Sequence, residues 1–251
     1  MELNKIYKED CLDTMSRMSD NFLDLVITSP PYDKLRTYNG YCFDFENIVK
    51  ELYRVLKPGG VVVWVVGDAT EKGSETGTSF RQALYFKEVG FNIHDTMIWS
   101  KTNPMPKVKT KRYFDKFEYM FIFSKGQPTT FNPIMQKCKS GGKVYDSTAK
   151  KITTGQERQK KTFILNDERY KDNIWELAVA QNKTKHPAVF PLNLAIDHVT
   201  SWSNEGDIVY DPFMGSGTTA LASRSVNRDY IGSEISEEYC KICEDRLLIN
   251  K

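Results

Sequence analysis

The sequence predicts an α/β fold in which a mostly parallel sheet is flanked by helices. Strand-like apolar runs alternate with segments of helical periodicity along its 251 residues, and this alternation is typical of parallel strands joined by helical crossovers. Hydrophobic residues make up 40% and charged residues 27%, as in an ordinary globular protein. The length suits one large domain with an insertion, since domains usually span roughly 100 to 200 residues.

Each predicted element follows from its own pattern. Apolar runs rich in β-branched and aromatic residues predict strands over 23–28, 61–66, 96–99, 118–123, 207–210 and 230–233. Apolar residues spaced by three and four predict helices over 45–56, 79–89, 191–202, 218–226 and 236–248. Glycines mark two helix ends, because Lys57-Pro58-Gly59-Gly60 follows the first helix and Gly90 the second.

The periodic pattern fails between 126 and 185, and we expect an irregular insertion there. Residues 137–171 contain ten Lys and Arg against four Asp and Glu, a net charge of +6, so the rest carries −4 of the total of +2. A basic segment in an otherwise mildly acidic protein predicts a surface for a polyanion. A solvated loop would explain the same composition equally well.

Membrane, disulfide-rich and metal-binding proteins are not expected from the composition. No apolar run approaches ~18 residues and the first residues form no apolar signal region, so we expect a cytoplasmic protein. Five unevenly spread cysteines do not predict a disulfide framework. Cys240 and Cys243 form a C-x-x-C pair, but no second pair completes a zinc site, and their spacing puts both on one face of the helix over 236–248.

The first chemical motif, Thr28-Ser29-Pro30-Pro31-Tyr32, directly follows the predicted strand over 23–28. The carboxyl ends of parallel strands are where open α/β sheets bind ligands. Two prolines stiffen the turn, so the Ser29 hydroxyl, the Pro30 carbonyl and the Tyr32 ring form one fixed group. Such a group suits a planar base that carries an amino group. Alternatively, Ser29 only caps a turn and Tyr32 lies in the core.

The second motif is Asp211-Pro212-Phe213-Met214-Gly215-Ser216-Gly217-Thr218-Thr219, where a short strand runs into a glycine turn that opens a helix. The backbone can approach a ligand closely at the glycines and free N–H groups face it, so an anionic or carboxylate-bearing cofactor fits. Glu234 ends the next strand, where its carboxylate is placed to accept both hydroxyls of a ribose. A turn used only for packing and a surface position for Glu234 are the plainer alternatives.

The spacing Gly215-x-Gly217-x-x-Ala220 also satisfies the alanine variant of the dinucleotide-binding fingerprint. Two observations oppose a dinucleotide. Only 34 residues follow Gly217, too few for the second half of such a fold, and a hydride transferase gives no role to the turn with the two prolines. A phosphate-binding P-loop is excluded, because no Gly-x-x-x-x-Gly-Lys-Ser/Thr occurs.

Taken together, the two motifs resemble those of the DNA amino-methyltransferases that use S-adenosyl-L-methionine. The order of the segments is that of the β class of this family: the catalytic motif comes first, the basic insertion follows, and the cofactor motif comes last. The resemblance implies a Rossmann-like methyltransferase fold with a mostly parallel, seven-stranded type of sheet. It further implies a catalytic part over 1–125, an inserted target-recognition region over 126–185 and a cofactor-binding part over 186–251.

The resemblance also assigns roles to residues, position by position. Ser29, Pro30, Pro31 and Tyr32 would hold the target base. The cofactor would be bound by residues from three parts of the chain: Asp10, Cys11, Thr184, His186, Pro187, Asp211, Phe213, Gly215, Gly217, Thr218 and Glu234. Asp10 is otherwise explained as the N-cap of a short helix over 11–18. DNA contacts are predicted for Arg36, Lys150, Lys151, Lys160 and Lys161.

The residue before the prolines bears on which base is modified. Most adenine-N6 enzymes of this family have Asp or Asn there, whereas Ser is usual in cytosine-N4 enzymes. Ser29 therefore favours N4 of a flipped-out cytosine, with adenine N6 as the alternative. A non-catalytic nucleic-acid-binding subunit, a different class, is opposed by the intact motifs. The expected partners are double-stranded DNA and a cognate restriction endonuclease.

Overall fold

The computed structural model describes residues 1–31, 43–104, 111–146, 162–179 and 190–249. Contacts divide the chain into two compact units. Unit 1 comprises Met1–Asn132 and Asn173–Lys251, and unit 2 comprises Pro133–Asp172. The predicted insertion, 126–185, is longer than unit 2 at both ends.

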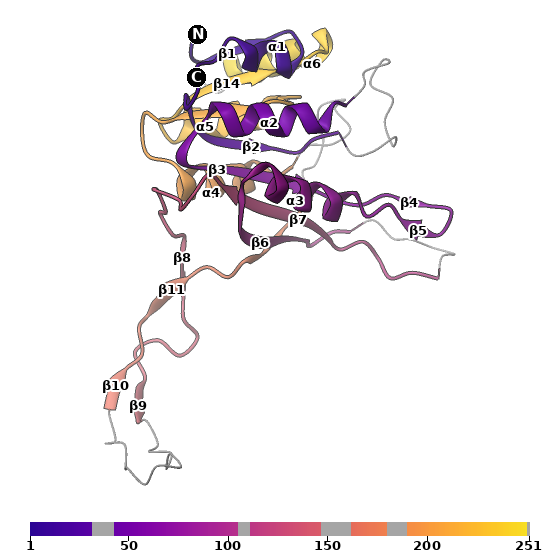
Figure 1. Ribbon diagram of the computed structural model, residues 1–251. Coiled ribbons are helices and arrows are strands. Elements are labelled where there is room, and N and C mark those ends of the chain that lie inside the picture. The colour runs from indigo at the N-terminus through magenta and orange to yellow at the C-terminus, as the bar shows by residue number, and fades with distance from the viewer. Residues whose placement is uncertain (32–42, 105–110, 147–161, 180–189, 250–251) are drawn as a thin grey trace. The chain divides into compact units, whose positions relative to one another are not determined.

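Unit 1 is built on an eight-stranded sheet in the order β1-β14-β13-β2-β3-β7-β6-β12 (Figure 1). Its strands are β1 (Lys5–Tyr7), β2 (Leu23–Thr28), β3 (Leu56–Val66), β6 (Asn92–Lys101), β7 (Phe117–Ser124), β12 (Ile174–Leu177), β13 (Ile208–Asp211) and β14 (Asp229–Ser233). Only β7 runs antiparallel to its neighbours in this sheet. The predicted α/β architecture with a mostly parallel sheet is confirmed.

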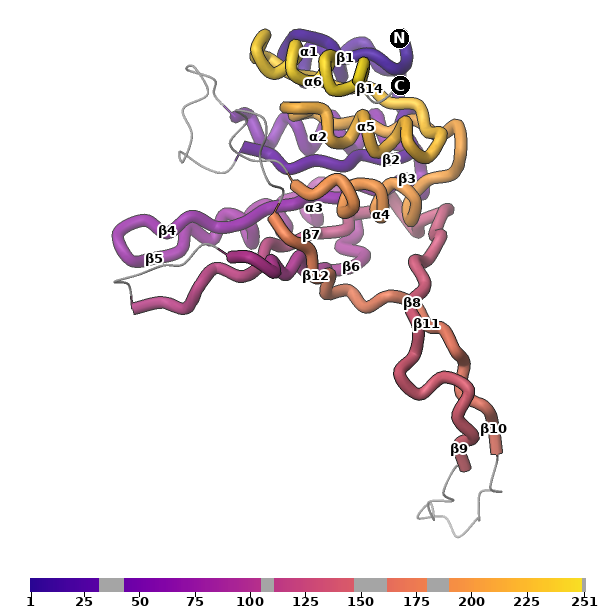
Figure 2. Tube along the Cα trace, turned by 180° about the vertical axis from the view of Figure 1, so that it is seen from behind, coloured from indigo at the N-terminus to yellow at the C-terminus, as the bar shows by residue number. Residues whose placement is uncertain are grey.

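Helices cover both faces of this sheet. They are α1 (Cys11–Ser16), α2 (Phe45–Val55), α3 (Thr78–Val89), α4 (Leu192–Trp202), α5 (Thr218–Ser225) and α6 (Glu237–Ile249). The first three pack against one face, and α4 and α5 against the other, where α6 lies on α5 (Figure 2). None of the helices in the described ranges is long and apolar enough to cross a membrane.

Strand β3 shows why the sequence folds in three layers. Its residues alternate between the two cores: Val62, Trp64 and Val66 pack beneath α2 and α3, and Val61, Val63 and Val65 pack beneath α4. All six are at most 1% exposed. A strand buried on both faces requires a continuous apolar run, which is what the sequence has here.

The parallel strands place the functional segments at one edge of the sheet. Five neighbouring strands, β1, β14, β13, β2 and β3, run in the same direction. The segments that follow their last residues therefore meet at the carboxyl edge: Tyr7, Thr28, Val66, Asp211 and Ser233. Both sequence motifs begin at this edge.

The structure contains strands that the sequence analysis missed. Strand β1 extends one edge of the sheet, and β12 extends the other by pairing with β6 within the segment predicted to be an irregular insertion. These strands have three and four residues, too few for a periodic pattern to stand out. A hairpin of β4 (Thr70–Glu71) and β5 (Ser74–Glu75) was also missed, and β3 begins at Leu56 rather than at 61.

Unit 2 consists of two short antiparallel strand pairs. One joins β8 (Met135–Lys137) to β11 (Glu168–Tyr170), and the other joins β9 (Val144–Asp146) to β10 (Thr162–Ile164). Every residue of β9, β10 and β11 is exposed. In the part of unit 2 that the structure describes, the pairs form a ribbon without a core of its own.

Candidate cofactor and catalytic site

The turn after β2 carries the predicted catalytic residues. Pro30 is buried, whereas Ser29 and Pro31 are partly exposed at the carboxyl edge. The residue before the turn, Thr28, is fully buried, and its Oγ1 donates a hydrogen bond of 2.6 Å to Asp211 Oδ1. The base of the turn is thus anchored to the strand that leads into the glycine turn.

The Asp211 carboxylate connects three elements. Besides Thr28 at the end of β2, it accepts hydrogen bonds from Thr219 Oγ1 of α5 at 2.6 Å and from the backbone N–H of Phe213 at 3.0 Å. Its side chain is almost completely buried, and burial raises its pKa to about 6 although the three donors favour the ionised form. This predicted cofactor residue links the catalytic turn to the glycine turn.

The glycine turn needs its glycines for two reasons. Gly215 and Gly217 have φ angles of 51° and 83°, in the left-handed region that other residues adopt at a cost. A Cβ on Gly217 would also lie 2.1 Å from Cys243 Sγ of α6. The thiol fills the space under the turn, and burial raises its pKa to about 12, which makes Cys243 an inert packing group.

Glu234 braces the same turn from the end of β14. Its Oε2 accepts a 2.8 Å hydrogen bond from Gly215 N, and its Oε1 accepts one of 2.8 Å from Ser236 N. Burial is the main effect that raises the pKa of this carboxyl group. Each carboxylate oxygen has a second lone pair, so both retain the capacity to accept a hydroxyl. The geometry fits the predicted ribose contact.

Asp10 and Cys11 lie beside this region, after β1. Asp10 Oδ1 accepts a 2.7 Å hydrogen bond from Leu12 N and so is the N-cap of α1. The Tyr7 carbonyl accepts a 3.0 Å hydrogen bond from Glu234 N. The end of β1 is therefore tied to the end of β14, which places Asp10 at the same edge as Glu234.

Several predicted site residues lie outside the described part of the chain. They are Tyr32 and Arg36 after the catalytic turn, Lys150, Lys151, Lys160 and Lys161 in the insertion, and Thr184, His186 and Pro187 after it. Of the predicted cofactor residues that the structure does describe, Phe213 packs with its ring centroid 5.5 Å from that of Phe43, and Thr218 opens α5.

Arg246 of α6 was not predicted and contacts the glycine turn. Its guanidinium donates hydrogen bonds to the carbonyl oxygen of Ser216 and, at 2.9 Å, to Ser216 Oγ. Burial lowers the pKa of Arg246. It follows Cys243 by three residues, so both lie on one face of α6 and support the turn together. Helical spacing predicts that shared face, but the sequence does not show what the face packs against.

A cavity of about 170 Å³ opens near the carboxyl end of β3. Its lining combines three aromatic rings with charged groups: Gly67, Asp68, Glu75, Phe80, Lys101, Asp115, Phe117, Glu118 and Tyr119. Lys101 and Glu118 form a 2.6 Å ion pair whose side chains are only 18% and 15% exposed.

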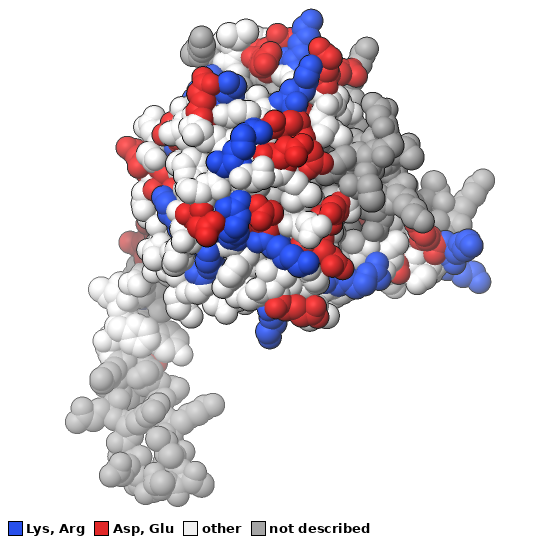
Figure 3. All heavy atoms as spheres, turned by 45° about the horizontal axis from the view of Figure 1, so that its top comes forward, with Lys and Arg blue, Asp and Glu red and all other residues white. Residues whose placement is uncertain are grey.

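On the face of the molecule drawn in Figure 3, charges of both signs are interspersed among the described residues.

Comparison with known proteins identifies the family of the chain. Over residues 23–245, the sequence matches the family of N6 and N4 methyltransferases described as DNA methylase. The chain belongs to this family. The orphan methyltransferase M.BamHII of Bacillus amyloliquefaciens is 54% identical over 240 residues, which are 92% of this chain and 90% of that protein. The type II methyltransferase M.BglII of Bacillus subtilis is 28% identical over 255 residues, 96% of this chain and 68% of that protein.

Solved structures show the same fold. The complex of M1.HpyAVI with S-adenosyl-L-methionine has 25% sequence identity and a TM-score of 0.62, covering 96% of this chain and 98% of that one. The cytosine-N4-specific PvuII DNA methyltransferase has 22% identity and a TM-score of 0.72, covering 96% and 85%. The protein is a DNA amino-methyltransferase, and S-adenosyl-L-methionine is its methyl donor. Among the described residues, no three His, Cys, Asp or Glu side chains gather as a metal ion would require.

Replacing Gly217 by alanine tests the cofactor turn. We expect Gly217→Ala to weaken binding of S-adenosyl-L-methionine about tenfold or more, because the new methyl group collides with Cys243. Gly206→Ala is the matched control, since Gly206 has a similar φ of 81° with no atom within 4 Å of the added methyl. Calorimetric titration should show unchanged binding for Gly206→Ala, and Cys243→Ala should partly rescue Gly217→Ala. Equal binding by both glycine variants would contradict this role.

Asp211→Asn tests the buried carboxylate. A folded-state pKa of about 6, above the usual 3.8, means that folding binds a proton at intermediate pH. Asp211 should therefore lower the free energy of unfolding by about 2 kcal/mol as the pH rises from roughly 4 to 7. Urea unfolding of the parent and of Asp211→Asn at both pH values isolates this contribution. An identical pH dependence in the two proteins would exclude it.

Proposed function

We propose that the protein transfers a methyl group from S-adenosyl-L-methionine to N4 of a cytosine in double-stranded DNA. The observation that carries this choice is Ser29, which stands before the two prolines where adenine-N6 enzymes usually have an acid or its amide. Its position at the end of β2, one residue after the Thr28–Asp211 hydrogen bond, supports a role next to the methyl donor. Adenine N6 on the same scaffold is the alternative.

The turn acts on the amino group of the base. An exocyclic amine is a poor nucleophile because its lone pair is delocalised into the ring. If Ser29 Oγ and the Pro30 carbonyl each accept one N–H, the nitrogen becomes pyramidal and its lone pair points away from the ring. The bound cofactor supplies an electrophilic methyl group on a sulfonium. Positioning and electrostatics then account for catalysis, and no cysteine nucleophile is needed.

A base inside a duplex cannot reach such a turn. We propose that the target cytosine is flipped out and that Tyr32 stacks on its face. Stacking of a base on an aromatic ring contributes about 1 to 3 kcal/mol. The contact would offset part of the cost of unpairing the base.

The basic insertion, 126–185, is proposed as the target-recognition region, with DNA contacts from Lys150, Lys151, Lys160 and Lys161. Its sequence supplies the positive charge that a DNA backbone attracts. A protein that methylates DNA must be in the compartment that holds the DNA, and we propose that this is the cytoplasm. The relative M.BamHII is named an orphan methyltransferase, which supports action without a partner nuclease; a cognate restriction endonuclease stays a prediction.

Ser29→Ala tests the catalytic turn. We expect it to keep cofactor affinity and to lose most methyl transfer, about 100-fold or more, because one acceptor of the amino group is removed. Transfer of a tritiated methyl group to plasmid DNA measures the rate.

Digestion of the DNA methylated by the parent protein then shows which nucleoside forms: N4-methylcytosine supports the proposal, and N6-methyladenine overturns the choice of base.

Neutralising the insertion lysines tests the DNA surface. Replacing Lys150, Lys151, Lys160 and Lys161 by glutamine should weaken DNA binding and flatten its salt dependence, since each phosphate contact contributes roughly −0.9 to the slope of log K against log salt. Binding titrations over a range of salt concentrations measure this slope. The parent slope in the variant would show that these lysines do not contact DNA.

A further inference from the structure

The ribbon of unit 2 exposes large apolar and aromatic side chains. Six of them are 45% to 68% exposed: Met135, Val144, Tyr145, Phe163, Ile164 and Tyr170. Two-stranded ribbons of this length are at best marginally stable in water without a face packed against something else. These side chains therefore indicate a binding surface.

The strand register sorts the apolar side chains at β9 and β10 into two faces. Tyr145 pairs with Phe163, and Val144 pairs with Ile164. Because neighbouring side chains of a strand alternate, the aromatic pair lies on one face of the ribbon and the aliphatic pair on the other. The two rings are 5.3 Å apart between centroids, with an interplanar angle of 46°. They form one contiguous aromatic surface.

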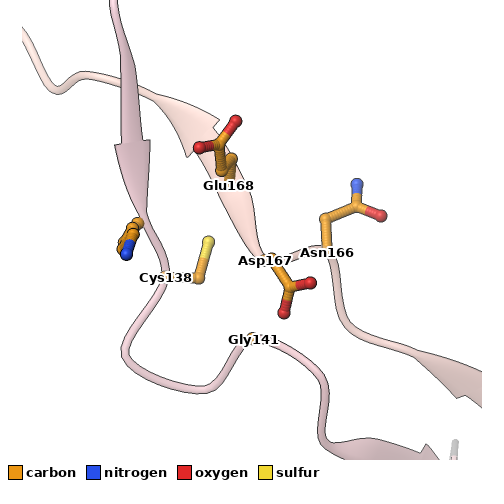
Figure 4. Close-up of a pocket in the computed structure, with 6 residues that line it drawn as sticks. Cys138, Gly141, Asn166, Asp167 and Glu168 are labelled. Carbon is orange, nitrogen blue, oxygen red and sulfur yellow. The ribbon is translucent and has the colours of Figure 1, made fainter.

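Backbone hydrogen bonds between 138–142 and 165–167, here called the joint, connect β9 and β10 to the other strand pair of unit 2. Cys138 N donates to Asp167 O at 2.7 Å, and Gly142 N donates to Leu165 O at 3.0 Å. Gly141 lies so close to Asp167 that a Cβ would be 2.7 Å from its Cα. Figure 4 shows Cys138 and Asp167 on the facing segments of this joint. The joint links the two strand pairs through direct backbone contacts.

The charge beside the aromatic pair indicates what it binds. Lys137, Lys139 and Lys143 are exposed on the segment that leads into β9. The net charge of 137–171 is +6. Lysines favour a polyanion, whereas exposed aromatic rings favour apolar groups such as the thymine methyl on a base edge, and DNA offers both. A two-stranded ribbon also has the width to enter the major groove, which is about 12 Å wide.

We propose that Tyr145 and Phe163 contact DNA bases in the groove, while the nearby lysines contact phosphates. The proposal rests on the proposed DNA substrate and assigns sequence discrimination to an apolar contact. Contacts with bases carry sequence information and contacts with phosphates carry salt dependence. The two kinds of residue should thus produce separable effects.

The test compares four variants of the full chain. Tyr145→Thr/Phe163→Thr should bind DNA about tenfold more weakly with an unchanged salt slope, since losing the contact with one base pair typically costs about that much in affinity. It should also relax the sequence pattern of methylated sites, mapped by sequencing plasmid DNA. Val144→Thr/Ile164→Thr is the matched control on the opposite face, with β-branched threonine introduced at the same two strands. It should keep both the affinity and the site pattern.

The third variant replaces Lys137, Lys139 and Lys143 by glutamine. It should reduce the salt slope by about 3 at most and leave the pattern of methylated sites unchanged. Tyr145→Phe/Phe163→Tyr retains both rings and should restore parent affinity, which separates loss of the contact from loss of the ribbon.

Three results would overturn the proposal. One is parent affinity and site pattern in the threonine variant of the aromatic pair. Another is an equal loss from the two threonine variants. The third is a change of oligomeric state: sedimentation finds the parent protein as a dimer and Tyr145→Thr/Phe163→Thr as a monomer, while DNA binding is the same. The rings would then contact a second copy of the chain. Absence of any methylated base with the parent protein would instead refute the proposed activity.

Discussion

The buried carboxylate of Asp211 is the interaction on which the site depends. It joins Thr28 and Thr219, residues 183 and 8 positions away along the chain, to the strand that ends at Asp211 itself. Besides these hydrogen bonds, the turn after β2 and the glycine turn are connected by the short β2–β13 pairing and by Thr219 Oγ1, which donates to Ile27 O at 3.4 Å. An ionised carboxylate in the interior is costly, and its raised pKa reflects that cost. The cost arises at the position that joins the turn after β2 to the glycine turn.

The long elements could be predicted from the sequence, and the short ones could not. Strand β3 and helices α2 and α4 each carry at least two periods of their pattern, so their type was predicted correctly and only their ends differ. Strands β1 and β12 each contribute three or four residues to an edge of the sheet. Their positions are determined by pairing with β14 and β6, which are distant in sequence. No local pattern contains that information.

The same distinction applies to the site. The glycines of the turn could be predicted because their requirement is local: a positive φ needs glycine. The support from Cys243 and Arg246 could not, since it depends on how α6 packs against the glycine turn, where Ser216 and Arg246 are 30 residues apart in sequence. Glu234 lies between these cases. The sequence predicted its place at the end of a strand, but only the structure shows that Gly215 N donates to it, so the proposed cofactor contact would be coupled to the geometry of the turn.

The order of motifs along the chain is independent of the geometry of the site. The catalytic motif comes first and the cofactor motif last, yet β2 and β13 are neighbours, with Leu25 paired to Val209 and Val26 to Tyr210. Parallel pairing alone brings the two carboxyl ends together, and it does not depend on the length of the chain between them. An inserted ribbon is therefore tolerated between the motifs, because it changes neither the strand pairing nor the Thr28–Asp211 hydrogen bond. Under the proposed role of the ribbon in target recognition, its sequence can change while the sheet of unit 1 keeps its structure.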